Sequence, residues 1–106
     1  MQTKNPNETV CILTRNNQLV LSEIMLLEAA INYTVFSLST GKKVVASSTL
    51  KRFEEEFPKN HFLRINKSMI LNKAFIKRID KNKVVLKNER IVAVSRRRLP
   101  FVLANF

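Results

Sequence analysis

The sequence predicts a mainly β fold, built of short, mostly antiparallel strands in small sheets with one or two short helices. In most segments the apolar residues recur with a period of two, and these segments are short and rich in Val, Ile and Phe. Asp, Asn and Gly residues, which tolerate tight bends, separate several of them. With 106 residues and 45% hydrophobic content the chain can bury one core, so we expect a single domain over residues 1–106.

Five strands are expected in the first half of the chain. They cover residues 9–14, 18–21, 23–29, 33–39 and 42–48. A turn at residues 15–17 joins the first two, and a turn at Gly41 joins the last two.

A helix is expected next, in the segment "STLKRFEEEF". Leu50, Phe53 and Phe57 recur there at helical spacing, and Pro58 ends the pattern. The three glutamates that follow Phe53 are expected to form a solvated face.

The second half returns to strands, expected over residues 62–65, 75–79, 83–87 and 90–95. Asp- and Asn-containing turns separate the last three, which predicts an antiparallel meander. A second helix is expected over residues 96–106 with Ser95 as its N-cap, although Pro100 is late for a first turn and could delay the start.

Positive charge is concentrated in one part of the chain. The 19 Lys and Arg residues against 8 Asp and Glu residues leave a formal charge of +11. Residues 59–98 hold thirteen of the basic residues and only two acidic ones, so the whole excess falls in that segment. A positive potential concentrated in this way predicts a polyanionic partner, with nucleic acid ahead of an anionic membrane.

The side chains needed for catalysis or metal binding are too few. His61 is the only histidine, Cys11 is the only cysteine, and a single glycine excludes a glycine-rich phosphate loop. We therefore expect no enzyme activity, no metal and no cofactor. The sequence shows neither a signal peptide nor an apolar run of about 18 residues that could span a membrane, which predicts a cytoplasmic protein.

Four motifs in a fixed order carry a resemblance to a known family. They are "LLEAAINYTVFSL", "SSTLKRFEEEF", "HFLRINKSMILNKAFIKRI" and "IVAVSRRR". In this succession the chain resembles the LytTR family of bacterial DNA-binding domains, most strongly over residues 24–98. The resemblance implies an elongated, mainly β domain that presents loops to successive major grooves of DNA. It also implies a transcription regulator, either stand-alone or the output domain of a response regulator in a two-component system.

Three DNA-binding positions in loops are implied by the resemblance. Asn32 and Tyr33 occupy the turn before a strand, where Asn can pair with a base edge and Tyr with a phosphate or a base. Lys67 would reach a guanine or a phosphate, and Arg97 would read guanine O6 and N7 with its guanidinium. Each position also has a plainer interpretation: an ordinary turn with a partly buried tyrosine, a solvated lysine, and an arginine that only clamps a phosphate.

Arg96, Arg97 and Arg98 support DNA binding on physical grounds as well. If a helix starts near Ser95, three cations at the positive end of its dipole are hard to explain by stability. They are easily explained by an incoming phosphate, which the helix amides also favour.

Loop support or a phosphate contact is expected of four further residues. Arg64 and Ser68 belong to the "R-x-x-x-S" frame of the family, and we expect them to hold the loop. Asn66 stands where many relatives have histidine; it keeps a donor and an acceptor but cannot become charged. Ser95, at the junction of the last expected strand and the second expected helix, is the fourth of these residues.

Two alternatives stay open beside sequence-specific binding of double-stranded DNA. A non-specific module for RNA or single-stranded DNA would need aromatic side chains among the basic residues, where only His61, Phe62 and Phe75 are available. A basic adaptor for an acidic protein or a membrane would need a basic amphipathic helix, whereas the first expected helix carries the acidic run. For the leading interpretation we expect no membrane partner and a monomer in solution that pairs on direct repeats of DNA.

Overall fold

The computed structural model describes residues 10–14 and 17–106, with side chains from Gln18 onward. The first half contains β1 (Val10–Thr14), β2 (Asn17–Val20), β3 (Ile24–Ala30), β4 (Tyr33–Leu38), β5 (Lys43–Ala46) and α1 (Leu50–Glu56). The second half contains β6 (Phe62–Asn66), β7 (Met69–Asn72), β8 (Ile76–Asp80), β9 (Lys83–Leu86), β10 (Ile91–Ala93) and α2 (Leu99–Asn105). Two 3-10 turns, η1 (Leu21–Glu23) and η2 (Lys73–Phe75), precede β3 and β8. The fold is mainly β, as the sequence predicts.

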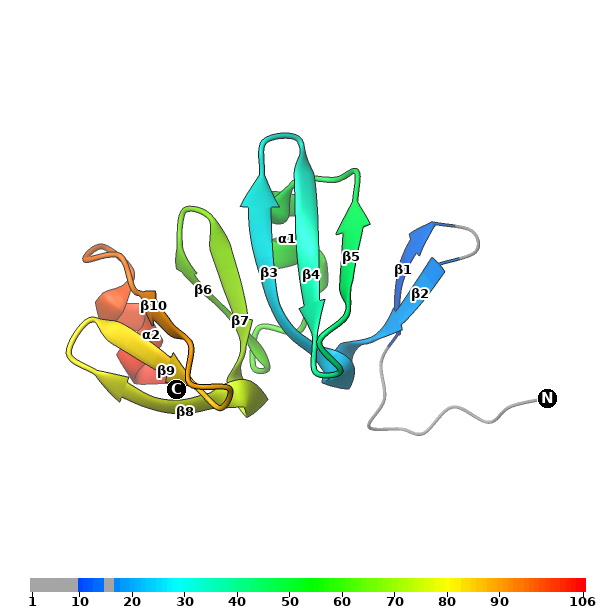
Figure 1. The fold of residues 1–106 in the computed structure, drawn as a ribbon. Helices are drawn as coiled ribbons and strands as arrows, with labels where there is room; N and C mark the ends of the chain where they lie inside the picture. The colour runs from blue at the N-terminus through cyan, green and yellow to red at the C-terminus, as the bar shows by residue number, and fades with distance from the viewer. Residues whose placement is uncertain (1–9, 15–16) are drawn as a thin grey trace.

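The described strands form three antiparallel sheets, which lie in a row (Figure 1). The largest sheet has the order β5-β4-β3-β7-β6, the next has the order β10-β9-β8, and β1 pairs with β2. The predicted meander is therefore confirmed. The molecule measures 46 × 30 × 24 Å along its principal axes, so it has the elongated shape that the resemblance implied.

Strand β3 lies in the middle of the large sheet, and both of its faces are buried. Leu26 and Leu27 point to opposite faces, and both are completely buried. Leu27 belongs to a first core cluster with side chains of α1, and Leu26 belongs to a second with side chains of β9, β10 and α2. Strands β6 and β7 also contribute to both clusters, so the same three strands hold the two cores together.

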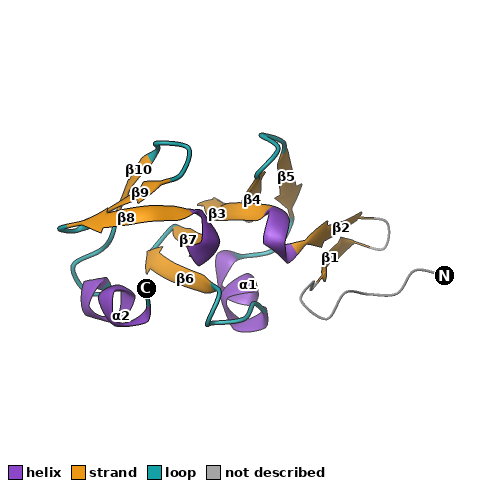
Figure 2. Cartoon of the chain, turned by 90° about the horizontal axis from the view of Figure 1, so that it is seen from below, coloured by secondary structure: helices purple, strands orange, loops and turns teal. Residues whose placement is uncertain are grey.

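Helix α1 closes the first cluster with aromatic side chains. Leu50, Phe53 and Phe57 are buried, as their helical spacing predicts. The ring of Phe53 packs edge-on against that of Phe36, with 4.9 Å between the centroids, and Phe57 lies at the same distance from Phe62. In Figure 2 both helices lie on one side of the row of strands.

Asn72 turns the chain from the large sheet into the three-stranded sheet. Its buried side chain donates a hydrogen bond from Nδ2 to the Ile24 carbonyl at 2.8 Å and accepts one from the Ala74 amide at 3.0 Å. The first bond ties the end of β7 to the start of β3, and the second opens η2. A buried amide that has partners on both of its ends fixes this corner.

One strand was missed from the sequence. The expected strands pass from residues 62–65 directly to 75–79, whereas Met69–Asn72 forms β7. All four residues of β7 are buried, so this strand lacks the alternation of apolar and polar residues on which the prediction depends. The expected turn at residues 15–17 includes residues 15 and 16, which lie outside the described part of the chain.

The C-terminal helix starts later than expected. Its N-cap is Arg98 and not Ser95, and its first residue is Leu99. A helix starting at residue 96 would place Pro100 in its fifth position, where the proline ring clashes with the carbonyl four residues earlier. Starting at Leu99 puts Pro100 in the first turn, where proline is tolerated.

Candidate nucleic-acid interface

Three chain segments, each carrying residues expected to bind DNA, lie along the same edge of the molecule. They are the β3–β4 turn (residues 31–33), the β6–β7 turn (residues 66–68) and the β10–α2 junction (residues 95–98), all at the upper side in Figure 1. We call these three segments the loop edge. About thirty residues of sequence separate each segment from the next, so the fold brings them together.

Hydrogen bonds link the three segments in a continuous row. The Ala29 amide, next to the first turn, donates to the Ser68 carbonyl at 2.9 Å. Asn66 Nδ2 donates to the Ala93 carbonyl at 2.8 Å, and the Ser95 amide donates to the Ile65 carbonyl at 2.9 Å. The β6–β7 turn is therefore the middle of the row and is attached to both neighbours.

Asn66 shapes the β6–β7 turn from inside. Its Oδ1 accepts hydrogen bonds from the Ser68 amide at 2.8 Å and from Ser68 Oγ at 3.1 Å, which is the local pairing that asparagine offers a tight turn. The same side chain reaches Ala93 with its amide group, so one residue both closes the turn and anchors it. Lys67, at the tip, is exposed.

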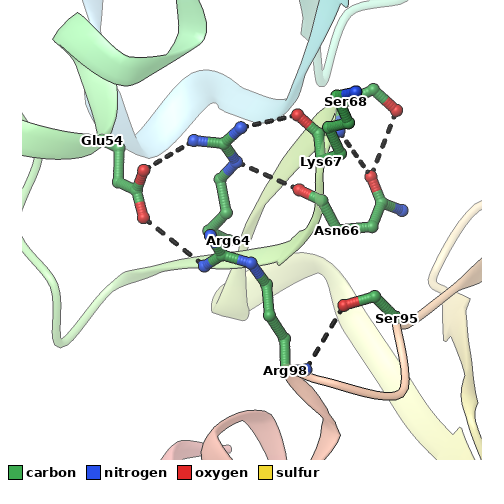
Figure 3. A network of polar contacts seen from close by, with 7 residues as sticks. All are labelled: Glu54, Arg64, Asn66, Lys67, Ser68, Ser95 and Arg98. Atoms are coloured by element: carbon green, nitrogen blue, oxygen red, sulfur yellow. Dashed lines mark hydrogen bonds and ion pairs between the residues drawn. The ribbon is translucent and has the colours of Figure 1, made fainter.

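Arg64 holds the same turn by its backbone carbonyls (Figure 3). Its guanidinium donates to the carbonyls of Asn66 and Lys67, at 3.0 and 2.5 Å, and to Glu54 Oε1 at 2.6 Å. The side chain is only 15% exposed. Because its guanidinium donates to acceptors within the protein, Arg64 is placed to support the loop.

Glu54 connects α1 to two segments of the loop edge. One of its oxygens binds Arg64, and the other lies 3.6 Å from the Arg98 guanidinium (Figure 3). The expectation that the glutamates after Phe53 form a purely solvated face is therefore wrong for Glu54, although Glu55 and Glu56 are exposed. No sequence signal marks this role, because the partners lie 10 and 44 positions away along the chain.

Ser95 organises the β10–α2 junction without being the helix cap. Its carbonyl accepts from the amides of Arg98 and Leu99, both at 3.0 Å, and its hydroxyl lies 3.3 Å from the Arg98 amide. This turn leaves Arg96 and Arg97 exposed before the helix begins. The argument that three arginines crowd a helix N-terminus therefore applies only to Arg98, the N-cap, and the exposed Arg96 and Arg97 precede the helix.

The β3–β4 turn is the most exposed part of the loop edge. Ile31 and Asn32 are exposed, and half of Tyr33 is accessible to solvent. Behind them Thr34 is completely buried and donates from Oγ1 to the Ser48 carbonyl at 2.7 Å. Strand β4 is thus fixed immediately behind its projecting residues.

Comparison with known proteins decides what kind of domain this is. The family model described as the LytTr DNA-binding domain matches residues 14–104. The chain belongs to the LytTR family. A solved LytTr DNA-binding domain from Bacillus cereus has the same fold, with a TM-score of 0.73 and 23% sequence identity over 96% of this chain and 100% of that one. Among curated proteins none matches the sequence.

In this LytTR domain the expected contact residues and the expected supporting residues differ in burial. Asn32, Tyr33, Lys67, Arg96 and Arg97 are exposed, whereas Arg64, Asn66 and Ser95 are half-buried and bonded to the protein. Two residues depart from this division. Arg98 is half-buried beside Glu54, and Ser68 is exposed although its amide and hydroxyl both bind Asn66.

Two other cations of the basic segment are paired with carboxylates. Arg90 donates two hydrogen bonds to the Glu28 carboxylate, at 3.1 and 3.0 Å, and this contact raises the pKa of Arg90. Lys77 lies 2.7 Å from Glu89 and lowers the pKa of that carboxyl group by hydrogen bonding. None of the ion pairs among the described residues involves Lys67, Arg96 or Arg97. The same holds for six other cations of the segment, which lie outside the loop edge: Lys59, Lys73, Arg78, Lys81, Lys83 and Lys87.

Two further expectations concern metals and membranes. In the described part of the chain, no group of three His, Cys, Asp or Glu side chains is placed to hold a metal ion. The described helices, α1 and α2, are both too short to cross a membrane.

Proposed function

We propose that this LytTR domain binds double-stranded DNA sequence-specifically, as part of a bacterial transcription regulator, and that the loop edge reads bases in the major groove. The observation that carries the proposal is the hydrogen-bonded row of three segments whose projecting polar and cationic side chains are free of ion pairs within residues 18–106. A hydrogen-bonded row of segments is suited to base reading, because only the exposed side chains, and not the backbone that carries them, have to be ordered on binding.

The length of the molecule supports contact with more than one groove. Major-groove sites on the same face of B-DNA are about 34–36 Å apart. The long axis of the domain measures 46 Å, and the loop edge occupies the part of the molecule from the β3–β4 turn to the β10–α2 junction (Figure 1). The domain as a whole is therefore long enough to lie across more than one groove, and its loops can enter a groove without a recognition helix.

The chemistry of each segment suits a distinct part of the duplex. Asn32 offers a donor and an acceptor to a base edge, and Tyr33 offers its hydroxyl to a phosphate or base. Lys67 supplies a point charge for a guanine acceptor or a phosphate, and Arg97 supplies a planar two-donor fork that matches guanine O6 and N7. Arg96 and Arg98 are suited to phosphates on either side.

Arg64, Asn66, Ser68 and Ser95 act as supporting residues in this proposal. Their polar groups are used within the protein, as the distances above show, and they set the positions of Lys67 and Arg97. Because Asn66 cannot be protonated, we expect the middle turn to keep its structure across the pH range in which a histidine would change charge.

The alternative functions have less support. The described helices are not basic and amphipathic: α1 reads LKRFEEE, and α2 reads LPFVLAN. A single-strand binder would stack bases on several exposed aromatic residues among the basic ones, but Phe62 is buried and Phe75 is half-buried, which leaves only His61 exposed of the three candidates. We propose one DNA-binding unit over residues 1–106, which acts in the cytoplasm without an enzymatic step or cofactor and pairs on direct repeats although it is monomeric in solution.

Selection from a pool of random duplexes tests the proposal. A base-reading domain should enrich a consensus, and its affinity for that sequence should exceed its affinity for a scrambled duplex by a factor on the order of 10³ or more. Enrichment of no sequence, with equal binding to duplex and single strands, would contradict it.

A further inference from the structure

Ile31 occupies an energetically unfavourable backbone position at the tip of the β3–β4 hairpin. Ala30 pairs with Tyr33, so Ile31 and Asn32 form the whole turn. The φ angle of Ile31 is +58°, in the left-handed region that favours glycine or asparagine and is rare for a β-branched residue. The adjacent Asn32 would suit this conformation better, yet the left-handed position holds the isoleucine.

No packing within the protein offsets this cost. Ile31 is 96% exposed, more than any other large hydrophobic residue among those described. The turn between β8 and β9 provides a comparison, since Lys81 has the same φ of +58° there. Lys81 carries an unbranched, charged side chain, which water solvates well. An exposed aliphatic, β-branched side chain in this conformation gains nothing from the free protein.

The position of Ile31 makes it available to the same partner as the loop edge. It belongs to the segment that includes Asn32 and Tyr33, and the neighbouring Ala29 is bonded to Ser68 in the next turn. In Figure 1 this hairpin projects beyond the other turns at the upper side.

One group on the base edges of the major groove matches an exposed aliphatic side chain. Hydrogen-bond donors and acceptors make up the rest of the pattern, but thymine presents its C5-methyl group there. We propose that Ile31 packs against the C5-methyl group of a thymine and sets a preference for thymine at one position of the site. This inference rests on the proposed function and adds an apolar contact to the polar ones given above.

Replacing thymine by uracil removes only the methyl group and leaves base pairing intact. Each thymine of the selected duplex is replaced in turn, and the dissociation constant is measured at one fixed salt concentration. Loss of one buried methyl group should weaken binding about fourfold at a single position. Uracil at other positions should have little effect.

Three variants assign that effect to the side chain. Ile31→Gly suits the left-handed backbone, so the variant should melt at the same temperature as the wild type or higher, and it should bind the thymine and uracil duplexes equally. Lys81→Gly relieves the same backbone conformation in the β8–β9 turn. This variant should keep the fourfold difference in affinity between the thymine and uracil duplexes. Ile31→Val, which retains a branched aliphatic group, should keep most of it.

The outcomes separate this inference from the function on which it rests. If the wild type selects a duplex but tolerates uracil everywhere, or if Ile31→Gly keeps the thymine preference, the contact does not exist while DNA binding stands. If the wild type binds selected and scrambled duplexes alike, the proposed function fails, and the inference fails with it.

Discussion

Arg97 distinguishes base reading from simple attraction to phosphate. If its guanidinium donates to guanine O6 and N7, Arg97→Ala should cost roughly 1–3 kcal/mol on the selected duplex and much less on a scrambled one. Arg97→Lys keeps the charge but loses the planar fork, so it should retain non-specific affinity and lose much of the sequence preference. Binding curves on both duplexes at one salt concentration measure the two effects.

Lys81→Ala is the control for Arg97. Lys81 is exposed in the β8–β9 turn, outside the loop edge, so its removal should weaken both duplexes slightly and equally. A phosphate clamp at Arg97 would give the opposite ranking, with Arg97→Lys nearly normal. That result would remove Arg97 from the base-reading residues and leave DNA binding itself intact.

At the scale of elements, Glu54 couples α1 to the loop edge. Glu54→Gln keeps the shape of the side chain but withdraws the charge that Arg64 and Arg98 share, so we expect a loss of roughly 1 kcal/mol in the free energy of unfolding. The preference for the selected over the scrambled duplex should also fall, because the β6–β7 turn and the β10–α2 junction lose a common anchor.

Glu55→Gln is the matched control for Glu54. Glu55 is exposed on the same helix, and no ion pair among the described residues includes it. Its replacement makes the same change in net charge and should raise affinity for both duplexes alike. If the two variants behave identically, Glu54 acts only through its charge and does not position the loops.

Elements whose side chains alternate between solvent and core could be predicted from the sequence. Leu50, Phe53 and Phe57 mark the face of α1, and β10 alternates, with Val92 buried between the exposed Ile91 and Ala93. Strand β7 could not be found in this way, because it is buried on both faces. The expected N-cap at Ser95 was wrong, but the delay that Pro100 was expected to cause is observed, because the proline governs where the helix can begin.

The candidate site was predicted in part. Its exposed residues came from motifs in the right order, and the structure places them along one edge. The bonds that join them could not be predicted, because Asn66 with Ala93 and Glu54 with Arg98 are pairs distant in sequence. Ile31 was not singled out either, since its unusual feature is a backbone angle and not its residue type.

For the whole molecule, the excess of positive charge predicts a strong dependence of binding on salt. Each phosphate contact should contribute about −0.9 to the slope of log K against log salt concentration, so contacts by Lys67, Arg96 and Arg98 should give about −2.7. Titrations between low and moderate salt measure this slope. An affinity that barely changes would show that phosphate neutralisation contributes little.

The contact surface itself can be observed by NMR. Titrating the isotope-labelled protein with the selected duplex should shift the backbone amides of residues 31–33, 66–68 and 95–98 most strongly. Amides of the β4–β5 turn around Gly41 should change little, because that turn lies at the opposite side of the large sheet (Figure 1). Shifts concentrated on α2, or spread evenly over the basic segment without the β3–β4 turn, would contradict the claim that three linked loops read the DNA.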